Sequence, residues 1–229
     1  MEKKYENLKF LVDDMEFEIG LDFEQAKLMS NFVAARGGEF KDVEFFKVAL
    51  QKYSKVPFLT DSMVAQIVAA LQEDGLETPF GILSYSELVE YIFVLFQQAI
   101  DDESKKYESP IVSFNKDNTV NITLSNGKTY KLMYVRENVE EAILSGQMEF
   151  NSILELYSVG SNLIRLALQH ERSSVKLPET IFLSLWSTQF DEENEELFTE
   201  VLSSLGHHMK DVLDSGVKKS KAVIKVKKN

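Results

Sequence analysis

The spacing of apolar residues changes from a helical period to strict alternation, and back again, near the middle of this chain. The segments IVSF at 111–114 and TVNITL at 119–124 precede SNGK at 125–128 and TYKLMYVR at 129–136. Alternation indicates strands, and Asn-Gly between two such segments is the strongest short signal for a β-hairpin turn. We therefore predict a three-stranded antiparallel meander. It is too small to be stable alone, so it must pack on helices.

Apolar residues recur at helical spacing on both sides of this meander. The whole chain contains only ten Gly and four Pro, which suits helices better than a turn-rich β-sandwich. Gly37-Gly38, Gly75 and Gly216 lie where helices would end, and Ser84 with Glu87 has the spacing of a capping box. The predicted helices span 3–15, 22–36, 41–54, a segment that is capped by Thr60 or Asp61 and ends before Gly75, 85–100, 139–148, 150–170, a segment beginning near Pro178, and 192–214.

These patterns predict a mainly α protein, a multi-helix body with a small three-stranded antiparallel β-meander inserted near the middle (α+β by a strict count). With 229 residues, of which 44% are hydrophobic, the chain is able to bury a sizeable core. We expect one compact unit followed by a tail. Its parts are an N-terminal helical part at 1–108, the meander at 109–136, a C-terminal helical part at 137–217 and a basic tail at 218–229.

Charge is divided unevenly between the body and the tail. The chain has 25 basic and 37 acidic residues, and the tail KKSKAVIKVKKN contains six lysines and no acid. Residues 1–217 therefore have 19 basic and 37 acidic residues, a net charge of about −18. Such a body repels phosphates, which argues against general nucleic-acid binding. The acidity is compatible with solubility alone, with imitation of a nucleic acid, or with binding to a basic protein surface.

The tail also alternates, with Ala222, Ile224 and Val226 between lysines, which predicts a strand. This strand could add to an edge of the meander or to a partner's sheet. Its lysines could instead contact nucleic acid or an anionic membrane, or the tail could be a disordered solubilising end. The candidate partner-binding residues are Lys218, Lys219, Lys221, Ile224, Lys225, Val226, Lys227 and Lys228.

Signatures of catalysis and of cofactor binding are absent from the sequence. It has no cysteine, no glycine-rich phosphate loop, no nucleophile elbow and no H-E-x-x-H motif, and we predict no cofactor. His207 and Asp211, four residues apart on a predicted helix, are two potential metal ligands, which are too few for a site. The acidic run DEENEE at 191–196 is explained by the dipole of the helix that it precedes.

The predicted function is that of a non-enzymatic, acidic protein-interaction component: an adaptor, an assembly factor or chaperone, or an inhibitor. Its expected partner is another protein with a basic surface or an open sheet edge. An enzyme with an unrecognised, metal-dependent site and a nucleic-acid mimic are the alternatives. No apolar run approaches the roughly 20 residues of a membrane span, and we expect a cytoplasmic protein. Only four of the 25 basic residues are arginine, which suggests a phage or a low-GC bacterium.

Overall fold

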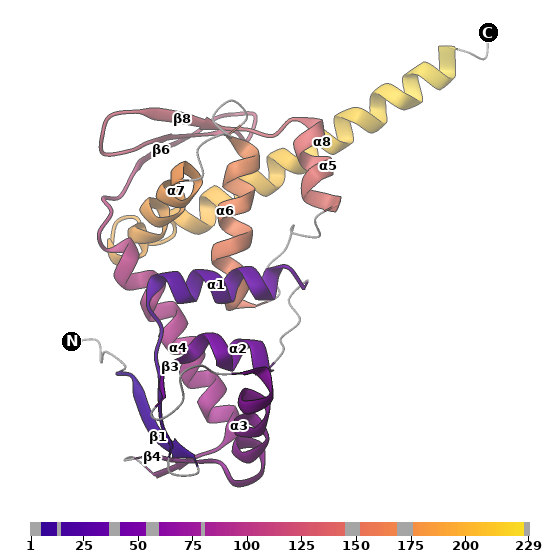
Figure 1. Ribbon diagram of the computed structural model, residues 1–229. Coiled ribbons are helices and arrows are strands. Elements are labelled where there is room, and N and C mark those ends of the chain that lie inside the picture. Colours follow the sequence, from indigo (N-terminus) through magenta and orange to yellow (C-terminus); the bar gives the residue numbers. More distant parts are fainter. Residues whose placement is uncertain are drawn as a thin grey trace. The chain divides into compact units, whose positions relative to one another are not determined.

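The computed structural model describes residues 6–12, 15–36, 42–53, 60–78, 81–144, 152–168 and 176–226. The chain divides into two compact units. Residues 1–102 and 151–156 form the first unit, and residues 103–150 and 157–229 form the second. Helices predominate among the described residues, and a small antiparallel meander is inserted between them (Figure 1). The predicted fold class is confirmed, whereas the four-part division of the chain stays a prediction.

The first unit begins with two strands where we predicted a helix over 3–15. Strand β1, Leu8–Val12, pairs with β2, Met15–Ile19, in an antiparallel hairpin. Leu8 and Phe10 are both buried, and they lie opposite Ile19 and the equally buried Phe17. The two-residue period of buried side chains therefore outweighs the helical spacing that the sequence also contains. The rings of Phe10 and Phe17 stack with their centroids 5.5 Å apart.

A third strand completes this sheet and shortens another predicted helix. Helix α2, Asp42–Ala49, occupies only the first part of the predicted 41–54 helix, and residues 50–53 form β3, Leu50–Tyr53, against β2. The strand order is β1-β2-β3. Strands β4, Leu76–Thr78, and β5, Gly81–Leu83, form a short antiparallel pair that we did not predict.

Three predicted helices of the first unit are confirmed, and each begins after a side-chain cap. Helix α1, Phe23–Ala34, begins after Asp22, whose Oδ1 accepts a hydrogen bond from the Gln25 N–H at 2.9 Å. Helix α3, Asp61–Asp74, is capped by Thr60, and α4, Tyr85–Ser104, by Ser84. The Ser84 N–H donates to Glu87 Oε2 at 2.7 Å, so the predicted capping box is present. Side-chain acceptors at these starts satisfy backbone donors that would otherwise lack partners.

The meander of the second unit has the predicted topology. Strands β6, Ile111–Phe114, β7, Val120–Thr123, and β8, Thr129–Leu132, are antiparallel in the order β6-β7-β8. Gly127, with φ +77°, supplies the left-handed position of the β7–β8 turn. One face of the sheet, with Val120, Ile122 and Leu132, is fully buried. That face determines which residues of β6 point inward.

Helices α5, Arg136–Leu144, α6, Leu156–Ala167, and α7, Lys176–Ser187, follow the meander. The 3-10 turn η1, Ile153–Glu155, belongs to the first unit, and η2, Thr188–Phe190, follows α7. Asn138, which directly precedes the predicted 139–148 helix, lies inside α5, where its Nδ2 donates to the Leu166 carbonyl at 2.7 Å. The buried amide therefore links α5 to the end of α6 instead of beginning a helix.

An aromatic cluster forms the core where α6, α7 and α8 meet. The ring of Phe182 packs against those of Tyr157, Trp186 and Phe198, with centroids 5.2, 5.8 and 5.5 Å away. Gly160 permits this contact, because a Cβ at that position would lie 2.7 Å from Phe182 Cε2. Gly160 therefore allows α6 and α7 to pack closely.

Helix α8, Leu197–Val226, differs from the prediction at both ends (Figure 1). It begins five residues later than expected, and it continues through Gly216, so the predicted helix end there is wrong. The predicted strand in the tail is also wrong as far as Val226, because that backbone is helical. Apolar residues separated by lysines fit either structure, and the sequence alone did not decide between them. None of the helices among the described residues has the length and apolar character needed to span a membrane.

Candidate functional site

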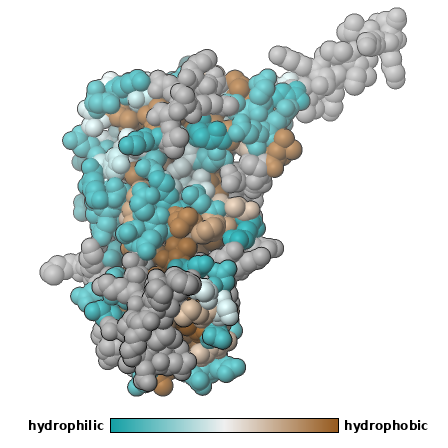
Figure 2. Space-filling view, in the orientation of Figure 1, coloured by the Kyte–Doolittle hydropathy of each residue, from teal (hydrophilic) through white to brown (hydrophobic). Residues whose placement is uncertain are grey.

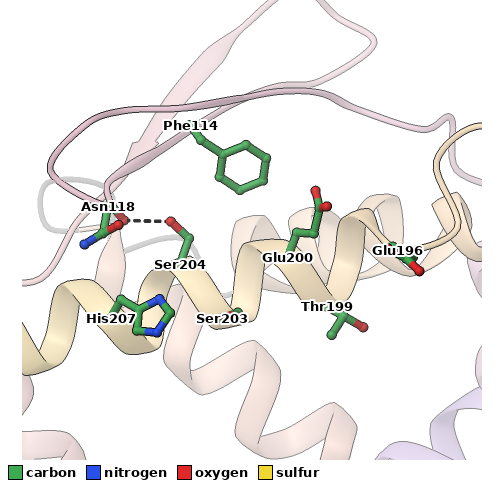
Figure 3. A pocket seen from close by; sticks show the side chains of 8 residues that line it. All are labelled: Phe114, Asn118, Glu196, Thr199, Glu200, Ser203, Ser204 and His207. Atoms are coloured by element: carbon green, nitrogen blue, oxygen red, sulfur yellow. Dashed lines mark hydrogen bonds between the residues drawn. The ribbon is translucent and has the colours of Figure 1, made fainter.

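An open groove of about 720 Å³ lies in the second unit, between the inner face of β6 and one face of α8 (Figure 3). The sheet contributes Phe114 and the residue Asn118, which lies in the turn between β6 and β7. The helical side, including the residue just before α8, is polar and consists of Glu196, Thr199, Glu200, Ser203, Ser204 and His207.

The polar wall follows from the amphipathic sequence of α8. Its lining residues recur three or four positions apart and therefore share one face of the helix. The apolar residues Phe198, Val201 and Leu205 fall between them and, like Met209 in the next turn, are buried. The same periodicity that attaches α8 to the core thus points carboxylates and hydroxyl groups into the groove.

Three hydrogen bonds attach the β6–β7 turn to α8 at one end of the groove. Ser204 Oγ donates to the Asn118 carbonyl at 3.1 Å, as Figure 3 shows. Asn118 Nδ2 donates to Asp211 Oδ2 at 3.0 Å, and His208 Nδ1 lies 2.9 Å from the carbonyl oxygen of Asp117. Asn118 has φ +59°, a left-handed conformation that asparagine tolerates better than most residues. The turn is therefore held in place by the helix.

The Asp117 carboxylate stabilises the turn itself. It accepts hydrogen bonds from the Thr119 hydroxyl at 2.7 Å and from the Thr119 N–H at 3.2 Å. These bonds, the hydroxyl first, lower the pKa of Asp117 below its ordinary value. The turn therefore presents an ionised carboxylate at neutral pH, and this carboxylate is committed to a structural role.

Strand β6 adds an exposed apolar surface beside the polar wall. Phe114, whose side chain lies on the groove side of the sheet, is 45% exposed, and Ile111, on the opposite face, is 74% exposed. On the face seen in Figure 2, hydrophilic residues cover most of the described surface and hydrophobic ones form separate patches. An exposed aromatic ring next to Glu196 and Glu200 gives the groove both an apolar and an anionic component.

The two candidate metal ligands are not brought together in a metal site. His207 lines the groove, while Asp211 accepts the hydrogen bond from Asn118. Within the described ranges, no three His, Asp or Glu side chains are grouped so that they could hold a metal ion. The groove offers carboxylates and hydroxyl groups, which are suited to hydrogen bonding and to attracting cations.

The candidate partner-binding residues of the tail have a different location from the groove residues. Lys218, Lys219, Lys221, Ile224, Lys225 and Val226 belong to the last part of α8, whereas Lys227 and Lys228 lie outside the described residues. Their role in binding stays a prediction.

The groove was not predicted from the sequence. The acidic run before α8 was explained as a helix start, and Phe114 was assigned to a strand without regard to its exposure. The polar periodicity of 196–207 was the available signal, but the sequence does not show which strand lies opposite it.

No protein-family model matches this chain. No curated protein and no solved structure is significantly similar to it either.

Proposed function

We propose that this protein is a non-enzymatic, acidic interaction component that binds a partner protein through a basic surface of that partner. An adaptor, an assembly factor or chaperone, and an inhibitor all fit this description. The observation that carries the proposal is the groove between β6 and α8, in which Glu196 and Glu200 lie on the wall opposite an exposed aromatic ring.

The chemistry of the groove matches that of lysine and arginine side chains. Carboxylates attract their charged ends, and the face of Phe114 suits a cation or the apolar stem of such a side chain. Thr199 and Ser203 add hydroxyl groups that accept or donate hydrogen bonds. The net charge of −12 draws a basic partner toward the whole molecule and accelerates its association.

The test is affinity capture from the native cells with the full chain and two double variants. Glu196→Gln/Glu200→Gln neutralises the groove. Glu192→Gln/Glu195→Gln is the matched control, because these exposed acids precede the same helix and do not line the groove. Both variants change the net charge by the same amount. Any difference in partner retention between them is therefore due to the position of the carboxylates.

We expect one basic protein to be retained near one-to-one by the wild-type chain and by the control, and to be lost from the groove variant. Retention should survive nuclease treatment and weaken as salt is raised, because the contact is electrostatic. Equal retention by all three chains would show that the groove is not the binding surface. Displacement of the partner by added DNA would favour the nucleic-acid mimic instead.

A further inference from the structure

Strand β6, which contributes Phe114 to the groove, has an edge that faces away from β7. Strand β6 is the first strand of the order β6-β7-β8, so only one of its edges pairs within the sheet. The hydrogen-bond pattern shows which residues face the open edge. The Asn115 N–H donates to the Thr119 carbonyl across the turn at 2.9 Å, so Asn115 faces β7.

Backbone groups of an antiparallel strand alternate between its two edges. Ile111, Ser113 and Asn115 therefore direct their N–H and C=O groups toward β7, and Val112 and Phe114 direct theirs away from it. The other hairpin gives the same result independently. The Leu124 N–H donates to the Lys128 carbonyl, so the even-numbered residues of β7 face β8 and the odd-numbered ones face β6.

The two edges of the sheet differ in the hydrogen bonding of their outward backbone groups. At the β8 edge, the outward N–H of Met133 donates to the Ala167 carbonyl at 2.9 Å, so the end of α6 covers that edge there. Among the described residues, no backbone hydrogen bond reaches the outward groups of Val112 and Phe114. An uncovered edge strand with exposed apolar residues is a template for another strand.

We propose that this edge and the groove beside it form one site, which binds an extended segment of a partner protein as a fourth strand of the meander. The segment carries basic residues at alternate positions. This inference rests on the proposed function and specifies the partner's conformation and pattern.

The open edge of β6 and the carboxylates of the groove both favour a basic, extended segment. An added strand would lie about 4.8 Å beyond β6 and would pair with the outward groups of Val112 and Phe114. Phe114 is in register with the fully buried Val120, so its side chain is on the inner face of the sheet. Inner-face side chains of the added strand would stand beside Phe114 and above the α8 face that carries Glu196 and Glu200.

The outer face of the sheet favours different side chains in the added segment. Ile111 lies on that face and is 74% exposed, so an added strand would place its outward side chains next to an apolar neighbour. Cross-strand contact favours β-branched residues at those positions. The matching sequence therefore alternates lysine or arginine with valine or isoleucine.

The test uses a fluorescein-labelled peptide of alternating lysine and valine, seven residues long, and the full-length protein. Its fully N-methylated analogue keeps every charge and has no backbone donors, so it controls for charge attraction alone. In the protein, Val112→Pro removes one outward N–H, and proline is tolerated at strand edges. Val112→Ala keeps that N–H and is the matched control for the lost side chain.

We expect the peptide to bind the wild-type protein and the Val112→Ala variant alike. N-methylation of the peptide or Val112→Pro should weaken binding at least about tenfold, because both remove backbone pairing. As a check that does not depend on the folding of Val112→Pro, the peptide should slow hydrogen exchange at the Val112 and Phe114 amides of the wild-type protein.

Other outcomes would overturn the inference. If the methylated peptide and Val112→Pro bind normally while Glu196→Gln/Glu200→Gln weakens binding, the basic-partner function stands and strand addition fails. If the protein alone is a dimer that Val112→Pro dissociates, the occupant is a second copy. Absence of peptide binding would overturn strand addition, whereas the capture experiment tests the wider function separately.

Discussion

Tyr134 is a buried polar residue that connects three elements of the second unit. Its hydroxyl donates to the Leu163 carbonyl of α6 at 3.0 Å, and its ring stacks on His208, with the centroids 6.3 Å apart. Only 2% of the residue is exposed. One side chain therefore joins the end of the meander to both α6 and α8. Burial raises the pKa of its phenol well above the ordinary value.

We expect Tyr134→Phe to lower the free energy of unfolding by about 1 kcal/mol at pH 8, the usual net contribution of one buried hydrogen bond. The pKa of the phenol is higher in the folded state than the value of about 10 in the unfolded chain. The stabilisation is therefore complete below pH 10 and is lost as the pH rises above it. Urea unfolding of both proteins at pH 8 and pH 10.5 measures the difference.

The difference between wild type and Tyr134→Phe should narrow at the higher pH, because only the wild type loses stability through this phenol. A difference that stays constant between the two pH values would mean that the hydroxyl ionises as readily in the folded protein as in the unfolded chain.

At the scale of elements, two glycines inside helices have opposite surroundings. Gly160 of α6 faces the ring of Phe182, and a Cβ there would lie 2.7 Å from the ring, while a Cβ at Gly206 of α8 would meet nothing within 4 Å. We expect Gly160→Ala to destabilise the protein by about 1–3 kcal/mol through overpacking. Gly206→Ala should stabilise it by about 0.5–1 kcal/mol, since alanine restricts the unfolded chain.

Thermal unfolding of the two glycine variants, each compared with the wild type, measures these opposite effects. A stabilising Gly160→Ala would show that α6 and α7 move apart easily, which would contradict the tight aromatic cluster around Phe182.

The elements also show why sequence patterns predicted some parts of the fold and not others. The meander was predictable because Asn126-Gly127 and the alternation of 119–124 agree. Helices α3 and α4 were predictable because a capping residue precedes each apolar stripe, and α1 because Gly37-Gly38 follows its apolar stripe. Residues 8–19 carry both a helical spacing and an alternation. The choice was made by the pairing of Leu8 with Ile19 and of Phe10 with Phe17, a contact that a local pattern does not contain.

The groove was less predictable than the fold for the same reason. The periodicity of α8 indicates that Glu196, Glu200 and His207 share a face, but Phe114 joins them only through tertiary packing. Likewise, the exposure of β6 depends on which helices cover the sheet.

At the scale of the whole molecule, the acidic body and the basic end of α8 would exert opposite electrostatic forces on the proposed basic partner. The full chain has a net charge of −12, whereas residues 1–217 carry about −18, because the six lysines all lie beyond them. Both charges would act on a ligand bound in the groove, and salt screens both. The distance over which they act falls from about 10 Å at 0.1 M salt to about 3 Å at 1 M.

We therefore expect a chain ending at Val217 to bind the lysine-valine peptide several-fold more tightly than the full chain at 0.1 M salt, because the repulsive lysines are gone. The two affinities should converge at 1 M salt. Fluorescence anisotropy measures both, and a full-length chain with its six tail lysines changed to glutamine separates the loss of charge from the loss of helix. Weaker binding by the shortened chain would instead assign the tail to the binding surface, as its sequence first suggested.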